Sequence, residues 1–281
     1  MSKRTTKSIL LTGGASGIGA AIARQAVERG HRVLIADVNR EDGAAVASSI
    51  GSGASFIPLD ITSAKQWNRA LDAAWKQFGA LDVLLNNAAV VHTGLARNVS
   101  LADHEQTMAV NVMGPIKGML AALPRFHAQG SGHFVTVCSM TAFVPFPGLA
   151  SYAASKHALR AFHHALAIEE RRSPIAFSII HPTSTETPML EKEADSDEVP
   201  MAFLSKSVTA AYVASVVLDA MERAKLEVFM PPESARMVRM LGTNPRSMLK
   251  QADKAEAIGA AKLEKRRAAH AAASRTSREG P

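Results

Sequence analysis

The 281-residue sequence has few cysteines and aromatic residues, and it lacks a long uninterrupted apolar segment. Its one cysteine, Cys138, cannot form an internal disulfide, which favours a reducing compartment. Near the N-terminus, only Ser8 to Leu11 separate the basic residues from polar, glycine-rich sequence. That stretch is too short for a signal-peptide core or a membrane span. We therefore expect a cytoplasmic protein without a membrane span.

Signals for metal binding, serine hydrolysis and nucleic-acid binding are also missing. The ten histidines show no His-x-x-x-His or Cys/His spacing, so we predict no metal site, and there is no Gly-x-Ser-x-Gly elbow. The net charge of +7 comes from a basic N-terminal tail, residues 1–7, and a basic, Ala-rich C-terminal extension, residues 247–281. The body between them is neutral and has no basic stripe with interleaved aromatics, so we expect no nucleic-acid partner.

Short apolar runs alternate with helical patterns along the body of the chain. The expected strands are 8–12, 31–36, 55–59, 81–85, 133–138, 175–180 and 226–230. The expected helices are 20–29, 41–50, 62–78, 101–129, 150–170 and 208–224. This alternation predicts an α/β fold, a single Rossmann-type doubly wound parallel sheet flanked by helices over residues 8–246. Residues 189–206 mix acids with Met, Phe and Leu, and we interpret them as a mobile substrate lid.

A glycine cluster follows the first expected strand and opens the first expected helix. Its central residues are Gly13, Ser16, Gly17, Ile18 and Gly19. Glycines let the backbone approach a pyrophosphate, and a helix N-terminus offers unpaired N–H groups. A cluster of glycines alone is often only a tight turn, but between a strand and a helix it indicates a dinucleotide-binding loop.

Acidic residues end the next two strands. Asp37 follows the second strand, where a carboxylate can accept hydrogen bonds from the ribose hydroxyls of an adenosine; the alternative is a turn or helix-capping acid. Asp60, followed by Ile61, could meet the adenine amino group or cap the next helix. Because a 2′-phosphate would repel Asp37, the sequence predicts NAD, with NADP less favoured. Arg40 is the one candidate cation that could relieve this repulsion, and we expect it to point to solvent.

Tyr152 and Lys156 lie one turn apart on an expected helix and Ser139 ends an expected strand. A phenol titrates near ~10, and a cation at ~4 Å in an effective dielectric of about 20 supplies the ~4 kcal/mol needed to bring it to about 7. This arrangement predicts a general acid/base, with the Ser139 hydroxyl holding a substrate oxygen. The alternative is a half-buried helix tyrosine beside a solvated lysine.

Two asparagine segments add polar groups near the same sheet edge. Asn87 and Ala88 follow the fourth strand, where an Asn can bond across neighbouring loops. Asn111 lies within the long expected helix, just before Gly114 and Pro115, and this combination predicts a kink with a freed carbonyl. An exposed Asn on a Pro-bent helix is the alternative.

Taken in order, these motifs resemble the short-chain dehydrogenase/reductase family. The matching residues are Thr12-Gly13-x-x-x-Gly17-Ile18-Gly19, Asp60, Asn86-Asn87-Ala88, Asn111, Ser139, Tyr152-x-x-x-Lys156, and Pro182 with Thr187. The resemblance covers about residues 8–232. It implies hydride transfer between a nicotinamide cofactor and an alcohol or carbonyl group.

The resemblance also implies individual roles. Tyr152 would be the acid/base, Ser139 would steady the substrate oxygen, and Lys156 would lower the tyrosine pKa and bind the nicotinamide ribose. Asn111 would anchor a water in a proton relay, and Thr187 would meet the nicotinamide carboxamide. The sequence departs from the family at Ala89 and Thr183, where Gly is common, and we expect Thr183 to reshape the adjoining loop.

Apolar residues flank the expected site and point to an apolar, ring-shaped or lipid-like alcohol or carbonyl substrate. They are Phe143, Phe146, Leu149, Met189, Leu190, Met201, Phe203 and Leu204, and core packing of half of them is the alternative. An NADPH-dependent carbonyl reductase and a non-catalytic dinucleotide sensor are rival functions.

Small residues on helices 101–129 and 150–170, which the family pairs between subunits, predict a homo-oligomer, a tetramer or a dimer.

Overall fold

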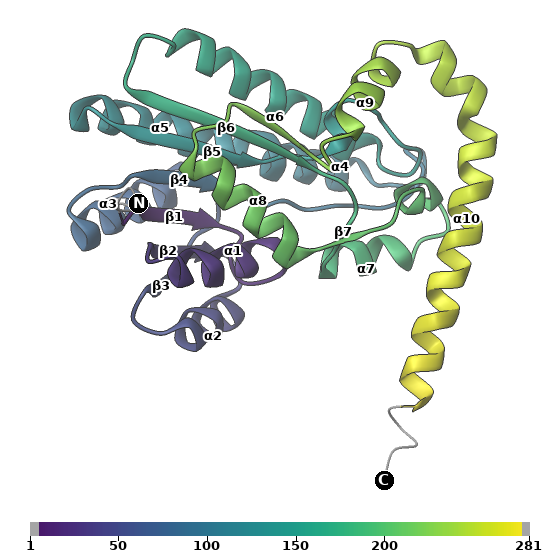
Figure 1. The fold of residues 1–281 in the computed structure, drawn as a ribbon, viewed down its shortest axis with the longest axis horizontal. Coiled ribbons are helices and arrows are strands. Elements are labelled where there is room, and N and C mark those ends of the chain that lie inside the picture. The colour runs from purple at the N-terminus through teal and green to yellow at the C-terminus, as the bar shows by residue number, and fades with distance from the viewer. Residues whose placement is uncertain (1–5, 277–281) are drawn as a thin grey trace.

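The structure, a computed structural model, describes residues 6–276, and its centre is a seven-stranded sheet (Figure 1). The strands are β1 (Ser8–Thr12), β2 (Arg32–Asp37), β3 (Ala54–Pro58), β4 (Val83–Asn86), β5 (Gly132–Val137), β6 (Ile175–Pro182) and β9 (Glu227–Met230). Their spatial order is β3-β2-β1-β4-β5-β6-β9, and every pairing is parallel. The predicted α/β fold with a doubly wound parallel sheet is confirmed.

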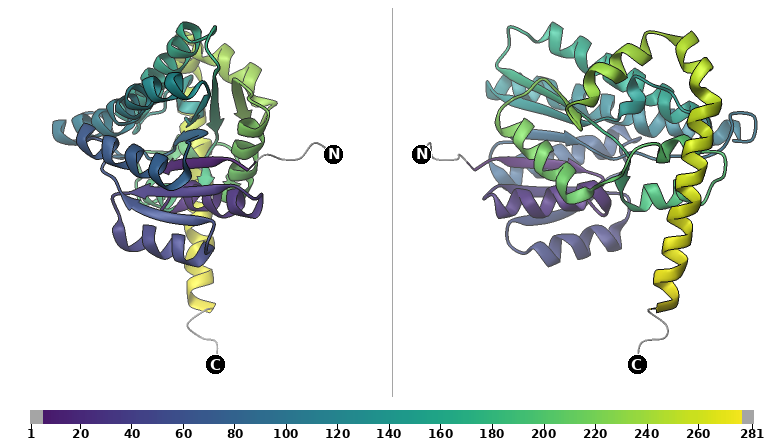
Figure 2. Two further views of the ribbon diagram at one scale, coloured as in Figure 1. Left: turned by 90° about the vertical axis from the view of Figure 1, so that its left-hand side faces the viewer. Right: turned by 45° about the vertical axis from the view of Figure 1, so that its right-hand side comes forward.

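Helices cover both faces of this sheet (Figure 2). One face carries α1 (Gly17–Glu28), α2 (Arg40–Ile50) and α8 (Ala210–Glu222), and the other carries α3 (Ala64–Phe78), α5 (Gly114–Gln129) and α6 (Ala150–Glu169). Alternate strand residues serve the two layers. Ile9 and Leu11 pack with α1 and α8, whereas Leu10 between them packs with α3 and α5. Strands buried on both faces explain why the sequence shows continuous apolar runs.

The order of the strands reverses beside β1, which pairs with β2 on one side and β4 on the other. Chain segments leaving the carboxyl ends of β1 and β4 therefore diverge to opposite faces. Parallel sheets of this kind bind ligands in the crevice at that point. The glycine loop follows β1 and the Asn86–Asn87 pair follows β4, so both predicted segments lie at the crevice.

The helix predicted over 101–129 is interrupted. Residues Leu101–Met108 form α4, Ala109–Met113 form one π-helical segment (η1), and α5 begins at Gly114. The Gly114 N–H donates to the carbonyl of Ala109, five residues back. The prediction of a backbone irregularity near Asn111 is thus correct, but its form is a π-helical insertion in the helix.

The C-terminal third contains elements that the sequence patterns did not define. The segment predicted as a lid folds into α7 (Pro188–Ala194) and the 3-10 turn η3 (Pro200–Phe203), flanked by a small two-stranded sheet of β7 (Thr185–Glu186) and β8 (Val208–Thr209). Next come α9 (Ser234–Gly242) and α10 (Pro245–Thr276). Across residues 6–276, no helix combines the length and apolar character needed to cross a lipid bilayer.

Helix α10 accounts for most of the predicted basic extension. It runs along the edge of the molecule beside α7 and η3 (Figures 1 and 2). Gly259 permits the close approach, because a side-chain carbon there would collide with the carbonyl of Pro200 in η3. The extension is therefore a long helix packed on the lid segment. Its last residues, 277–281, which the sequence predicts to fray, and residues 1–5 of the N-terminal tail lie outside the described range.

Candidate active site

Two cavities meet at the N-terminal end of α6. The first, about 670 Å³, follows the carboxyl ends of β1 to β4; the second, about 570 Å³, lies among α7, η3 and α9. Ile18, Cys138, Tyr152, Thr187 and Met189 line both cavities. A group at this junction can reach the contents of both cavities.

The glycine loop borders the first cavity and is shaped to admit a phosphate. Gly13 has φ +68°, and a side-chain carbon there would lie 2.6 Å from the Ala88 Cα, so only glycine fits. Ser16 precedes α1 but makes no side-chain capping hydrogen bond to it, so the first-turn N–H groups face the cavity without a protein cap. Gly17 and Ile18 also line this cavity. Gly19 does not; it packs tightly against the carbonyl of Gly13.

Asn87 fastens the glycine loop to the end of β4. Its side-chain amide donates to the carbonyls of Thr12 (3.1 Å) and Gly13 (2.9 Å), while its backbone N–H donates to the Thr12 hydroxyl. Both Asn87 and Ala88 line the first cavity. The predicted bond across neighbouring loops is therefore present.

The two strand-end acids also border this cavity. The Asp37 carboxylate accepts the Ala15 N–H at 3.0 Å and the Asn39 N–H at 3.0 Å. Asp60 accepts hydrogen bonds from the backbone and hydroxyl of Thr62, so it acts as a turn acid while still lining the cavity with Ile61. Within the described chain, Lys156 is the one cation that lines this cavity, and Arg40 is exposed outside it.

Tyr152 and Lys156 project from α6 into the junction. Lys156 is buried, and its Nζ lies 5.4 Å from the centroid of the Tyr152 ring. Burial lowers the pKa of the Lys156 ammonium. The alternative of a solvated lysine is therefore excluded, and both side chains have the one-turn spacing that the sequence predicts.

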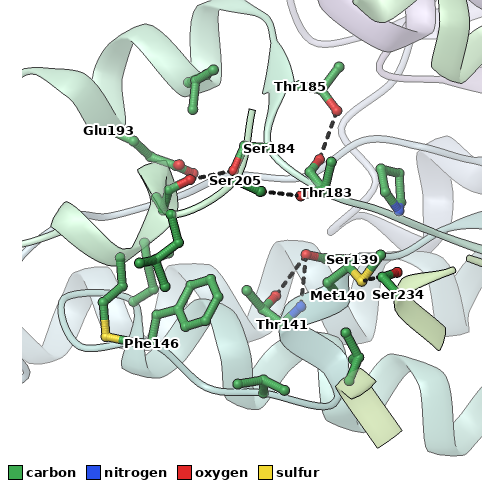
Figure 3. Close-up of a pocket in the computed structure, with 18 of the residues that line it drawn as sticks. Ser139, Met140, Thr141, Phe146, Thr183, Ser184, Thr185, Glu193, Ser205 and Ser234 are labelled. Carbon is green, nitrogen blue, oxygen red and sulfur yellow. Dashed lines mark hydrogen bonds between the residues drawn. The ribbon is translucent and has the colours of Figure 1, made fainter. Parts of the chain in front are cut away.

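Ser139 lies across from the phenol at the end of β5. Its Oγ accepts hydrogen bonds from the Thr141 N–H (3.1 Å) and the Thr141 hydroxyl (2.9 Å), which fix its orientation (Figure 3). Burial raises the pKa of Tyr152, as do the charges of Glu193 and Cys138, and a hydrogen bond with Ser139 lowers it in part. Burial therefore dominates the pKa of Tyr152 in this structure, and the lowering by Lys156 stays a prediction. The phenol is held in its protonated form.

Asn111 lies in the π-helical segment and is 1% exposed. Its Oδ1 accepts the Val90 N–H at 2.8 Å, and its Nδ2 donates to the Val90 carbonyl and to the Ser155 hydroxyl at 3.1 Å. The alternative of an exposed Asn is excluded. Asn111 contacts the neighbour of Lys156 rather than Lys156 itself.

The loop after β6 completes the junction. Thr187 caps α7 by accepting the Leu190 N–H, and its side chain faces Gly17. Pro182 lines the second cavity, not the first. Thr183 does not adopt positive φ; its N–H donates to the Met230 carbonyl and its hydroxyl pairs with Ser205. The loop therefore accommodates the threonine without backbone strain.

The second cavity has a mainly apolar lining. Of the predicted substrate-contacting residues, Phe146, Leu149, Met189, Leu190, Met201 and Leu204 line it. Phe143 and Phe203 do not; they pack in buried clusters. Helix α9 contributes Met237, Val238 and Leu241 to the lining. Their spacing places them on one face of a helix, but the sequence patterns did not identify them as part of the site.

The sequence patterns did not identify three polar residues near the site: Glu193, His181 and Glu227. Glu193 of α7 lines the second cavity, and His181 of β6 contacts both Ser139 and Glu227. Buried acids and histidines carry no short-range sequence signal, because their neighbours come from distant segments. Among residues 6–276, no group of three or more His, Cys, Asp or Glu side chains is arranged to hold a metal ion.

The fold and the site together define a dinucleotide-dependent oxidoreductase. The family model for short chain dehydrogenase matches residues 7–198, so the chain belongs to that family. It is similar to 2,5-dichloro-2,5-cyclohexadiene-1,4-diol dehydrogenase LinX of Sphingobium indicum, with 34% identity over 73% of this chain and 86% of that protein. It is also similar to a 3-alpha-(or 20-beta)-hydroxysteroid dehydrogenase of Mycobacterium bovis, with 32% identity over 66% of this chain and 71% of that protein.

Solved structures show the same fold. A short chain dehydrogenase/reductase from Burkholderia phymatum in complex with NAD has a TM-score of 0.80 and 24% sequence identity, covering 88% of this chain and 97% of that one. The protein is accordingly an NAD(P)-dependent oxidoreductase that acts on alcohol and carbonyl groups. Three features of the first cavity fit a dinucleotide. They are Gly13, where a side chain would collide with Ala88, the N-terminus of α1 without a side-chain cap, and the acids Asp37 and Asp60.

Proposed function

We propose that the protein is an NAD-dependent dehydrogenase of apolar, ring-shaped secondary alcohols and the corresponding ketones. The observation that carries this proposal is the position of Tyr152, at the junction between a polar cavity suited to a dinucleotide and an apolar cavity of about 570 Å³. An acid/base at such a junction can exchange a proton with a substrate oxygen while the substrate carbon faces the cofactor.

NAD, when bound, accepts a hydride from the carbon that carries the alcohol. In ketone reduction, the Tyr152 phenol would donate its proton to the substrate oxygen. In alcohol oxidation, the Tyr152 phenolate would accept the proton of the substrate hydroxyl, after the phenol's own proton has left through the relay toward Lys156. Ser139 orients that oxygen, since its hydroxyl is fixed by Thr141 and adjoins the phenol. The protonated state of Tyr152 in this structure is the form that a ketone requires.

Lys156, on α6, and Asn111, in the π-helical segment beside it, would assist the proton transfer at Tyr152. Lys156 lines the dinucleotide cavity, where its ammonium would bind the nicotinamide ribose and provide positive charge near the phenol. Asn111 is held by Val90 and Ser155, so its amide is fixed beside the turn that carries Lys156. This placement supports a relay through Asn111 to Lys156, with a water between them. Thr187, at the junction, would meet the nicotinamide carboxamide.

The choice of NAD over NADP rests on Asp37. Two backbone N–H groups hold its carboxylate at the end of β2, beside the glycine loop. A ribose 2′-hydroxyl can donate to this carboxylate, whereas a 2′-phosphate would meet a like charge. Arg40, the one candidate for relief, is exposed and does not line the cavity.

The substrate class rests on the second cavity and on the relatives. Four methionines, four leucines and Phe146 line it together with several Ser and Thr residues, and no Lys or Arg of the described chain lines it. The similar proteins from Sphingobium indicum and Mycobacterium bovis are named for a chlorinated cyclohexadiene diol and for hydroxysteroids. Both observations favour cyclic, uncharged alcohols over phosphorylated or carboxylated ones.

Purified protein assayed with NAD, NADP, NADH and NADPH against matched cyclic and linear alcohols and ketones tests the proposal. We expect NAD reduction, followed by absorbance, with cyclic secondary alcohols. Turnover confined to NADPH and ketones would instead support a biosynthetic carbonyl reductase. Cofactor binding by calorimetry without turnover of any panel member would support a non-catalytic dinucleotide sensor.

We also propose that the protein is a homo-oligomer, a tetramer or a dimer. Met113 at the end of the π-helical segment and Leu120 on α5 are one heptad apart and exposed, at 46% and 53% of their surface. Ile168 on α6 is 65% exposed. These side chains lie on the helices predicted to pair between subunits. Light scattering that shows a monomer at micromolar concentration would contradict the proposal.

A cytoplasmic location is part of the same proposal. Cys138, the one cysteine of the sequence, is a free buried thiol beside the junction. A reducing compartment keeps such a thiol unmodified. Fractionation of cells that express the tagged protein should recover it with the cytosol, and recovery with membranes or culture medium would contradict this location.

A further inference from the structure

Glu193 is the one buried carboxyl group among the residues that line the apolar cavity. It lies on α7, is 9% exposed, and extends among the side chains that surround the cavity (Figure 3). Glu233, the other acid in the lining, is exposed at the rim. A carboxyl group in an apolar wall requires an explanation, because burying it without partners costs free energy.

Three other acids near Glu193 in the chain have partners. Glu186 and Glu191 pair with Arg266 of α10, and Glu198 accepts hydrogen bonds from Leu95 and Asn98. For the Glu193 side chain, the structure of residues 6–276 shows neither a hydrogen bond nor an ion pair. Burial accordingly raises the pKa of Glu193 to about 7. The group is positioned to bind something that enters the cavity.

Glu193 is also electrostatically coupled to the catalytic tyrosine. Both side chains line the apolar cavity, and a charge on Glu193 raises the pKa of Tyr152. Ser139 and Glu193 both line the cavity and lie at separate parts of it (Figure 3). A substrate held by its reacting oxygen at Ser139 therefore presents a different part of its skeleton to Glu193.

We propose that Glu193 forms a subsite for a second hydroxyl group of the substrate, remote from the carbon that is oxidised. This inference rests on the proposed dehydrogenase function and specifies its substrates as cyclic diols and hydroxyketones. A hydroxyl suits this site because a carboxylate accepts its hydrogen bond and a carboxylic acid can accept or donate one. An ammonium group would have to lose its hydration in an apolar cavity, which opposes a cationic substrate.

A matched pair of substrates tests the subsite: trans-1,4-cyclohexanediol and cyclohexanol, which differ in the second hydroxyl alone. The kcat/KM of each is measured for the unmodified protein and for Glu193→Leu, Glu193→Gln and Asp195→Asn. We expect the unmodified protein to prefer the diol by about tenfold after allowance for its equivalent hydroxyls, as for one buried hydrogen bond. Glu193→Leu should abolish this preference, whereas Glu193→Gln, which keeps hydrogen-bonding atoms, should retain most of it.

Asp195→Asn is the matched control, since Asp195 ends the same helix at an exposed position outside the cavity lining; the preference of this variant should equal that of the unmodified protein. Equal efficiency with both substrates in the unmodified protein, or an undiminished preference in Glu193→Leu, would overturn the subsite. Calorimetry of both substrates with the NAD-bound protein separates this failure from a failure of the proposed function. Tighter binding of the diol that depends on Glu193, without turnover, would support the subsite while refuting the dehydrogenase. Binding of neither substrate would refute the subsite.

Discussion

His181 supports the backbone of Ser139 from inside the sheet. Its Nδ1 lies 3.1 Å from the Ser139 carbonyl oxygen, and its Nε2 lies 3.1 Å from Oε1 of Glu227. Both oxygens can only accept, so both ring nitrogens must carry hydrogens. Burial by itself lowers the pKa of His181, but contacts with Cys138 and Glu227 outweigh it and raise the pKa overall. Both acceptors and the raised pKa favour the imidazolium form of His181, which contacts the backbone of the residue expected to hold the substrate oxygen.

Replacing His181 by Leu should reduce kcat by about tenfold, because the Ser139 carbonyl loses a charge-assisted hydrogen bond. NAD affinity should stay unchanged, since His181 does not line the dinucleotide cavity. Because the pKa is raised in the folded state, the stabilisation is complete below the unfolded-state pKa of 6.5 and is lost as pH rises through the folded pKa. His181→Leu should therefore lower the free energy of unfolding most below pH 6.5 and less above the folded pKa of His181. Denaturant titrations at several pH values measure this difference. A pH-independent loss with normal kcat would contradict the positioning role.

Tyr152→Phe should lower turnover at least about hundredfold while leaving NAD affinity unchanged, because it removes the exchangeable proton alone. Lys156→Ala should reduce both turnover and NAD affinity, since Lys156 lines the dinucleotide cavity and adjoins the phenol. Steady-state kinetics and calorimetric cofactor titration of the two variants distinguish these effects. Substantial turnover by Tyr152→Phe would disprove the acid/base assignment.

Glu193→Gln should stabilise the protein at alkaline pH. Burial raises the Glu193 pKa from 4.5 to about 7, so ionisation opposes folding by up to about 3 kcal/mol above pH 7. This acid favours the folded state below its unfolded pKa, and that advantage is lost as pH rises through the folded value. Tyr152, Cys138 and Glu233 line the same cavity, Arg266 pairs with other acids, and no Lys or Arg of the described chain lines the cavity beside Glu193. Denaturation at pH 5 and pH 8.5 should show a stability gain in the variant only at the higher pH.

Features that depend on residues close together in the chain could be predicted from the sequence. Buried strands read as apolar runs, and the glycine loop and the Tyr152–Lys156 spacing reflect contacts within a few residues. Asn111 predicted a backbone irregularity, but its π-helical form depends on the Val90 and Ser155 partners that tertiary packing supplies. The direction of the Tyr152 pKa could not be predicted either, because its burial comes from segments far along the chain.

The C-terminal region shows the same limit more strongly. Helix α9 has apolar residues at helical spacing, and it was missed because its sequence follows a Pro-Pro pair and lacks a side-chain cap. Helix α10 has a weak apolar pattern, with Leu263 as a buried contact to the cluster of Leu190 and Phe203. Its position depends on arginine pairs with α7 and β7, and such pairs between distant segments cannot be inferred from composition.

Asp37→Asn should narrow the preference of the protein for NAD. In the unmodified protein we expect at least about a tenfold preference in kcat/KM, which requires only ~1.4 kcal/mol, whereas two anions at about 4 Å repel by roughly 4 kcal/mol at an effective dielectric near 20. The Asn side chain can keep the contact with Ala15 while removing the charge. Arg40→Ala is the control and should leave the preference unchanged. Equal efficiency with NAD and NADP in the unmodified protein would show that Arg40 reaches the 2′ position.

Arg266→Met should loosen α10 from the substrate cavity. Arg266 donates to both carboxylate oxygens of Glu186, at 2.8 and 2.6 Å, and to Glu191 of α7 at 2.5 Å, and it holds the Glu186 pKa at about 2. Arg266 thus joins α10 to β7 and to α7, the helix that carries Glu193. Leu263 of α10 packs in the same cluster as Tyr152. Since the pair is partly exposed, we expect a stability loss of only about 1 kcal/mol, but a several-fold rise in substrate KM with NAD affinity unchanged. Lys265→Met, at an exposed neighbouring position, is the matched control, and an equal KM in both variants would show that α10 does not hold the cavity wall in place.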